Sequence, residues 1–222
     1  MNIQRLNLLQ PMNIKRLKQA EAEFLQRYPG GFDDDDLKQV TKKHRVGKLA
    51  EQAQDLIGKT AFAKQATALE AIVKMVTRSS MVSLFEKPKF RDYVNGLSRA
   101  DRSELARGFE LLLHPPRKTQ QQKGFEQVLD VLTEGKLAKW SLMTICLFYL
   151  RPEDEVFVKP TTTKNAIAFF ELEGLDYKPR PSWDFYARYR DTITEMKSHV
   201  DPSLSPNNAA FTGFLMVTMG SR

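Results

Sequence analysis

Lysine and arginine residues alternate with aromatic residues in three stretches of the second half of the sequence. Aromatic rings can stack on bases while cations contact phosphates, so this pattern is typical of nucleic-acid binding. The stretches comprise Lys136, Lys139 and Trp140, then Phe157, Lys159 and Lys164, and finally Tyr177, Lys178, Arg180, Trp183, Tyr186, Arg188, Tyr189 and Arg190. They predict phosphate contacts from Lys159, Lys164, Arg180, Arg188 and Arg190, with Trp183 and Tyr186 as candidates for base stacking. Alternatively, Trp183, Tyr186 and Tyr189 pack inward at helical spacing, and the arginines pair with Asp184 or Asp191.

A second basic group lies near the N-terminus. Lys38, Lys42 and Arg45 follow one another at steps of four and three, which places them on one face of a helix. The net charge is +7, and residues 1–99 carry 18 Lys and Arg against 11 Asp and Glu, so the whole surplus lies there. Such a surplus favours polyanionic partners. We predict phosphate contacts from Lys38, Lys42, Lys43, Arg45 and Lys48; the alternative is an ordinary solvated helix face.

Signs of catalysis are few. The phosphate-binding loop, the dinucleotide glycine fingerprint and the nucleophile-elbow serine are absent from the sequence. The three histidines are isolated, and the one cysteine, Cys146, lies in an apolar run. Asp33 to Asp36 suit the first turn of a helix better than a metal site. We therefore expect no catalytic residue, no metal ion and no cofactor.

An enzyme is kept as an alternative. It would have a pocket between the apolar run 142–150 and the tryptophan-containing helix that follows Ser182. That pocket would hold a carboxylate with a raised pKa, and the nearest candidates are Glu155, Glu171 and Asp184.

Composition is that of a globular protein. The chain has 222 residues, 41% hydrophobic and 27% charged. It contains no apolar run of the roughly 18 residues that a membrane span needs, and its first residues lack a signal peptide's apolar centre. A single cysteine excludes an internal disulfide framework. We expect a cytoplasmic, bacterial-type protein that is not associated with a membrane.

Hydrophobic periodicity predicts helices throughout the chain. The expected helices span 12–28, 33–57, 60–78 and 89–96, one begins at Ser98 or Asp101, and others contain Phe125 to Leu132, Thr161 to Glu173, Trp183 to Met196 and Ala209 to Met219. Leu142 to Leu150 is apolar on all sides and indicates a buried helix or strand, while Pro160 favours an extended segment before it. The predicted fold is all-α, a multi-helix orthogonal bundle with an N-terminal helical hairpin. Residues 1–79 form a basic helical region and 80–222 a C-terminal helical domain.

Several segments carry a resemblance to known proteins. The pieces are SLFEKPKFRDYV, GFE with KLAKW downstream, FVKPTTTK, YKPRPSWDFYARYR and AAFTGFLM. On these pieces, residues 79–219 resemble a group of bacterial proteins known mostly as uncharacterised open reading frames, and looser versions occur near restriction and defence functions. That resemblance implies association with nucleic acid.

The chain is also similar to the core of helix-hairpin-helix DNA glycosylases, which is all-helical and ends with a helix leading into an apolar segment. It departs from that family where catalysis occurs. Residues 136–145 contain no glycine-rich hairpin, Lys159 stands where the catalytic aspartate would align, and no cysteines follow Met219. The resemblance therefore implies a shared helical shape, and no catalytic residue is carried over.

These observations favour a non-enzymatic helical protein that associates with DNA or RNA mainly through phosphate contacts. They require the two basic groups to converge into one strip in the folded chain. One alternative is a protein-interaction scaffold or homodimer formed through the helices of residues 12–78. The other is an enzyme acting on nucleic acid with a degenerate glycosylase-like core.

Overall fold

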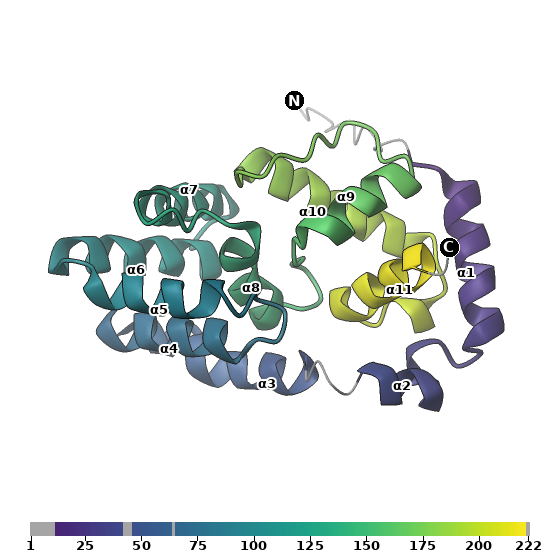
Figure 1. Cartoon of the computed structure of the whole chain (residues 1–222), viewed down its shortest axis with the longest axis horizontal. Helices are drawn as coiled ribbons and strands as arrows, with labels where there is room; N and C mark the ends of the chain where they lie inside the picture. The colour runs from purple at the N-terminus through teal and green to yellow at the C-terminus, as the bar shows by residue number, and fades with distance from the viewer. Residues whose placement is uncertain (1–11, 42–45, 64, 221–222) are drawn as a thin grey trace, which may run out of the picture.

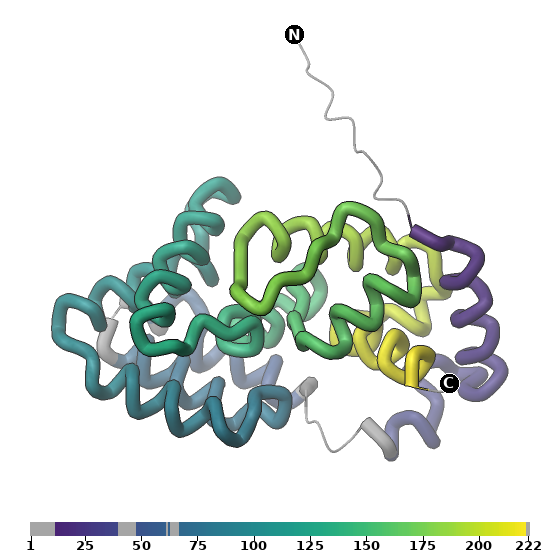
Figure 2. The backbone as a smooth tube through the Cα atoms, turned by 45° about the horizontal axis from the view of Figure 1, so that its top comes forward, coloured from purple at the N-terminus to yellow at the C-terminus, as the bar shows by residue number. Residues whose placement is uncertain are grey.

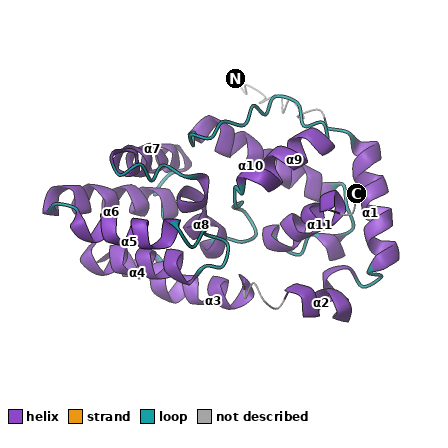
Figure 3. Ribbon diagram, in the orientation of Figure 1, coloured by secondary structure: helices purple, strands orange, loops and turns teal. Residues whose placement is uncertain are grey.

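The protein is all-helical. A computed structural model describes residues 12–41, 46–63 and 65–220, and the described residues contain eleven α-helices and no strand (Figures 1 and 3). The α-helices are α1 (Ile14–Arg27), α2 (Asp35–Thr41), α3 (Val46–Ile57), α4 (Gln65–Arg78), α5 (Glu86–Gly96), α6 (Arg99–Leu113), α7 (Lys118–Glu134), α8 (Trp140–Leu150), α9 (Pro160–Phe169), α10 (Trp183–Ser198) and α11 (Asn208–Gly220). The predicted all-α class is confirmed. The finer description, an orthogonal bundle with an N-terminal hairpin, stays a prediction.

Capping side chains set where several helices begin. The side chains of Asn13, Ser98 and Ser182 accept hydrogen bonds from the amides of Arg16, Asp101 and Phe185 and so start α1, α6 and α10. α9 begins differently from the prediction, because Pro160 occupies its first position and Lys159 before it is extended. Proline is pre-organised for this position. The threonines at 161–163 therefore lie inside the first turn and do not cap the helix, which ends at Phe169 rather than Glu173.

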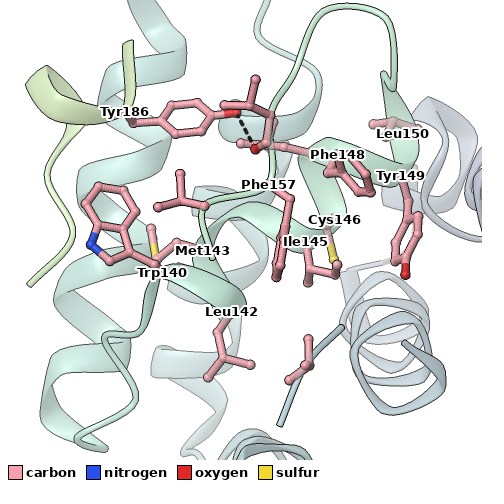
Figure 4. Packing of buried hydrophobic residues seen from close by; sticks show 14 of the residues in the cluster. Trp140, Leu142, Met143, Ile145, Cys146, Phe148, Tyr149, Leu150, Phe157 and Tyr186 are labelled. Carbon is pink, nitrogen blue, oxygen red and sulfur yellow. Dashed lines mark hydrogen bonds between the residues drawn. The ribbon is translucent and has the colours of Figure 1, made fainter. Parts of the chain in front are cut away.

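α8 lies at the centre of the molecule. Every side chain of α8 except Ser141 is buried, and α3, α4, α6 and α7 pack against it. Figure 4 shows Trp140 and Tyr186 on one side of this buried cluster and Tyr149 on the other. The sequence allowed either a buried helix or a buried strand for residues 142–150. The structure shows that they belong to a helix that is covered on all sides.

The other helices lie to either side of α8. In Figure 1, α4 to α7 lie on the left, α3 lies below α8, and α9, α10 and α11 lie on the right together with α1. α1 lies against α11, and the rings of Phe24 and Phe214 meet edge to face with centroids 5.4 Å apart (Figure 2). The backbone amide of Asn13 also donates a hydrogen bond to the backbone carbonyl of Phe170 at 2.8 Å. The beginning and the end of the described chain are thus packed together.

The N-terminal basic region differs from the prediction of one helix over residues 33–57. Asp33 lies in a short 3₁₀ turn, and α2 and α3 are separate helices on either side of residues 42–45, which lie outside the described residues. The helix expected at 60–78 is likewise a 3₁₀ segment, Lys59–Ala63, followed by α4. One face of α3 is buried, at Leu49, Ala53 and Ile57.

Buried residues on both sides of position 79 belong to one hydrophobic cluster. α3 packs on α8, and α4 packs on α5 and α6, so the described helices meet across the predicted boundary. The division into residues 1–79 and 80–222 stays a prediction. Within the described residues, no helix has the length and apolar character needed to cross a membrane.

Candidate functional site

A pocket of about 390 Å³, open to solvent on one side, lies where α8 and α9 begin. Three separate segments of the chain form most of its wall: Lys139, Trp140 and Ser141, then Phe157 and Lys159, then Tyr177. All but Ser141 belong to the basic and aromatic stretches singled out in the sequence. The fold thus gathers one part of each predicted stretch around a single cavity.

Trp140 holds these segments together. Its side chain is only 2% exposed, and its indole Nε1 donates to the carbonyl of Lys178 at 2.8 Å. The rings of Tyr177 and Phe185 lie 6.4 and 5.2 Å from it, centroid to centroid. A buried indole N–H needs an acceptor, so this hydrogen bond fixes the connector before α10 against the start of α8.

Lys139 and Lys159 supply the positive charge of the pocket. Each directly precedes a helix, has an extended backbone and makes no capping hydrogen bond with its side chain. Neither lysine has an ion-pair partner among the described residues. The first amides of a helix also carry partial positive charge, which adds to that of the lysines. The potential here favours an anionic group.

A carboxylate lies in the same pocket. Glu86, in the first turn of α5, accepts a hydrogen bond from the hydroxyl of Ser141 at 2.7 Å through its Oε2. Its other oxygen, Oε1, accepts no hydrogen bond from any described residue. The pocket therefore offers both cations and one free carboxylate oxygen to a ligand.

Glu155 forms the main buried ionic cluster of the described chain, away from the pocket. Its carboxylate is 3% exposed and lies 2.7 Å from Arg151 and 3.4 Å from Arg190. Tyr186 and Gln121 each donate a hydrogen bond to it at 2.7 Å. Burial raises the pKa of Glu155, but the two guanidinium groups and the two hydrogen bonds outweigh burial, and the pKa is lowered.

The enzyme alternative predicted a carboxylate with a raised pKa, and for Glu155 this is wrong because two arginines face it. The other two candidates are exposed and paired. Glu171 lies 3.0 Å from Arg16, and Asp184 lies 3.1 Å from Arg188. None of the three lines the pocket at α8 and α9. No cluster of potential metal ligands occurs within the described ranges.

The structure divides the predicted patch at 159–190. Lys159 lines the pocket, Lys164 lies over the ring of Tyr177 at 6.0 Å, and Arg180 is exposed beside Pro179, another lining residue. Arg188 and Arg190 are instead held by carboxylates on α10 and at Glu155. The patch therefore keeps its first three cations near the pocket.

The two proposed stacking residues, Trp183 and Tyr186, differ in how far they are buried. Tyr186 is fully buried, so it cannot stack on a base in this structure, and Tyr189 is 4% exposed. Trp183 is partly exposed, and the guanidinium of Arg190 covers its ring at 5.8 Å. Tyr186 and Tyr189 are therefore packed inward, and Arg188 and Arg190 are paired with acids, as the alternative interpretation has it, whereas Trp183 is only partly buried and Arg180 forms no ion pair within the described residues.

The N-terminal basic group is only partly described. Lys38 lies 3.5 Å from Asp33, and Lys48 is exposed on α3. Lys42, Lys43 and Arg45 lie outside the described residues. Figure 1 places α2 and α3, which carry Lys38 and Lys48, along the lower edge and α9, which carries Lys164, in the upper half.

Sequence reasoning missed the wall contributed by residues 81–86. Met81, Ser83 and Glu86 line the pocket, yet they fall between the helices expected at 60–78 and 89–96, and no role in a site was predicted for them. A signal was present in the neighbouring Leu84 and Phe85, two large apolar residues in a short segment without helical periodicity.

Comparison with known proteins adds no relative. The chain matches no protein-family model, and no curated protein or solved structure matches it significantly.

Proposed function

We propose that this protein binds nucleic acid without catalysing a reaction, mainly through contacts to phosphate groups. The observation that supports this most is the pair Lys139 and Lys159, two unpaired cations in one solvent-open pocket with aromatic walls. Lys164 and Arg180 extend the positive charge next to it. The basic surplus of the chain, +7, would attract a polyanion over a longer range.

Phosphate contacts make a quantitative prediction about salt. Each phosphate neutralised by a lysine releases condensed counterions, so the affinity falls steeply as salt concentration rises. Replacing both pocket lysines removes up to two such contacts. We expect K139E/K159E to weaken binding about tenfold or more at low salt and to make the plot of log affinity against log salt shallower by about one to two.

The test is a fluorescence-anisotropy titration of labelled oligonucleotides at two salt concentrations. The matched control is R107E/K118E, which makes the same change in net charge at two exposed residues outside the pocket. Equal weakening by both double variants would show that only net charge matters. No binding by the unmodified protein at low salt would overturn the proposal.

A homodimer through the helices of residues 12–78 finds less support. Among the described residues of that region, the only large apolar side chain that is exposed is Ile14, at 37%. A stable dimer normally buries a larger contiguous apolar patch.

A further inference from the structure

Two adjacent apolar side chains project into solvent beside the pocket. Leu84 is 79% exposed and Phe85 is 81% exposed, far more than any other large apolar residue in the described chain. They lie between Ser83 and Glu86, which both line the pocket, so they stand at its edge. An exposed ring next to a cationic cavity is the arrangement that proteins use to stack a base of a single strand.

The interior of the pocket suits a nucleotide better than a simple anion. Lys139 and Lys159 attract a phosphate, whereas the free Oε1 of Glu86 repels an anion and accepts hydrogen bonds. A nucleotide satisfies both requirements, because it combines a phosphate with donors on the base or ribose. Carboxylates accept in this way from the exocyclic amine of cytosine.

The size of the pocket restricts the form of nucleic acid. Its volume of about 390 Å³ is near the lower end of the range for pockets that hold one small molecule. A paired and stacked duplex cannot place a base in such a cavity, whereas a single strand can turn one nucleotide out of its stack. Among the aromatic residues of the wall, Tyr177 is partly exposed and would contact that base, whereas Trp140 and Phe157 are buried.

We infer that the pocket binds one unstacked nucleotide of a single-stranded nucleic acid, with its phosphate on Lys139 and Lys159, a base or ribose donor on Glu86, and the neighbouring base stacked on Phe85. This inference rests on the proposed function and deepens it, since it names the form of nucleic acid and the residues that select it.

The first experiment compares labelled 12-mers of dC, dT and rC with a 12-base-pair duplex by anisotropy. We expect the single strands to bind at least tenfold more tightly than the duplex, and the dC and rC arms report whether the ribose hydroxyl contributes. F85A should weaken single-strand binding about five- to 100-fold and leave duplex binding unchanged. M216A, which truncates an exposed apolar residue on α11, is the control and should bind as the unmodified protein does.

A second variant tests the carboxylate without disturbing its contact to Ser141. In E86Q the amide oxygen still accepts from Ser141, but the amide nitrogen cannot accept from a base. We expect E86Q to lose most of the preference for dC over dT while keeping its affinity for dT. Retention of the full dC preference would count against this part of the site.

The outcomes separate the two proposals. Equal affinity for single strand and duplex, unaffected by F85A, overturns the inference and leaves the proposed function standing. No binding to any oligonucleotide overturns both. A dimer detected by sedimentation and lost in F85A would instead assign Phe85 to a protein interface and overturn the inference.

Discussion

The carboxylate of Glu155 and the guanidinium of Arg190 lie 3.4 Å apart, and the carboxylate is 3% exposed while the arginine side chain is 23% exposed. Arg190 also lies over the rings of Trp183 and Tyr186. This contact joins the loop after α8 to the middle of α10, and the backbone carbonyl of Glu155 accepts from Asn208 at the start of α11. Glu155 therefore connects the loop after α8 to α10 through its carboxylate and to α11 through its backbone carbonyl.

Removal of that acid should destabilise the fold. A buried ion pair that loses one partner leaves an uncompensated charge, which costs about 3–5 kcal/mol. For E155A we expect the low end of this range, because Arg151 and Arg190 are partly exposed and can gain water. Urea unfolding followed by circular dichroism measures the loss. E153A, which truncates an exposed neighbour, should stay within about 0.5 kcal/mol of the unmodified protein.

The same cluster predicts how stability depends on pH. The pKa of Glu155 lies below its ordinary value of 4.5 in the folded chain. As the pH falls below 4.5, the unfolded state therefore binds a proton at this carboxylate before the folded state does. The contribution of the ionised carboxylate to the free energy of unfolding is fully present above pH 4.5 and is lost as the pH falls to the pKa of the folded state. Unfolding titrations between pH 6 and 3 should show a shallower decline for E155Q. Parallel curves for the two proteins would contradict this.

Cys146 should be unreactive in the native protein. It is 1% exposed on α8, and burial raises its pKa to about 12, so almost no thiolate forms at neutral pH. We expect no reaction with a thiol reagent at pH 8 until urea unfolds the chain. Because the chain has one cysteine, the reaction reports on α8 alone. Rapid labelling in buffer would mean that α8 opens locally.

The contact between α6 and α7 should not tolerate a larger residue at Gly124. A β-carbon at this position would lie 2.8 Å from the carbonyl oxygen of Gly108 and closer still to the amide of Leu112. Overpacking of this kind costs about 1–3 kcal/mol. G124A should therefore lower the free energy of unfolding, measured by urea denaturation. G96A, at a helical glycine with open space around it, should be neutral or slightly stabilising.

Periodicity and capping residues predicted most helices but could not predict which distant groups meet. Ser182 begins its helix as predicted, Ser98 is the one of the two predicted residues, Ser98 and Asp101, that begins α6, and Pro160 makes Lys159 extended as predicted. Under the enzyme alternative Glu155 was one of three candidates for a raised pKa, whereas its pKa is lowered, because its partners Gln121 and Arg190 come from other helices. Sequence spacing carries no information on such contacts.

The pocket shows the same limit. The basic and aromatic stretches indicated the right region, and Lys139, Trp140, Phe157, Lys159 and Tyr177 all line the cavity. At helical spacing, however, an inward ring cannot be told from an outward one, and the most exposed aromatic ring, Phe85, lies in a segment without periodicity. Phe85 directly precedes Glu86, and the contact of Glu86 with Ser141 depends on how α5 packs, which is a tertiary property.

The packing of α1 on α11 has a consequence for synthesis of the chain. α1 is synthesised nearly two hundred residues before α11, whose Phe214 packs against Phe24 of α1. At ordinary translation rates, the apolar face of α1 therefore remains without α11 to cover it for on the order of ten seconds or more. During that interval the nascent chain exposes the apolar face of an amphipathic helix, and a chaperone has both a binding site and the time to bind to it.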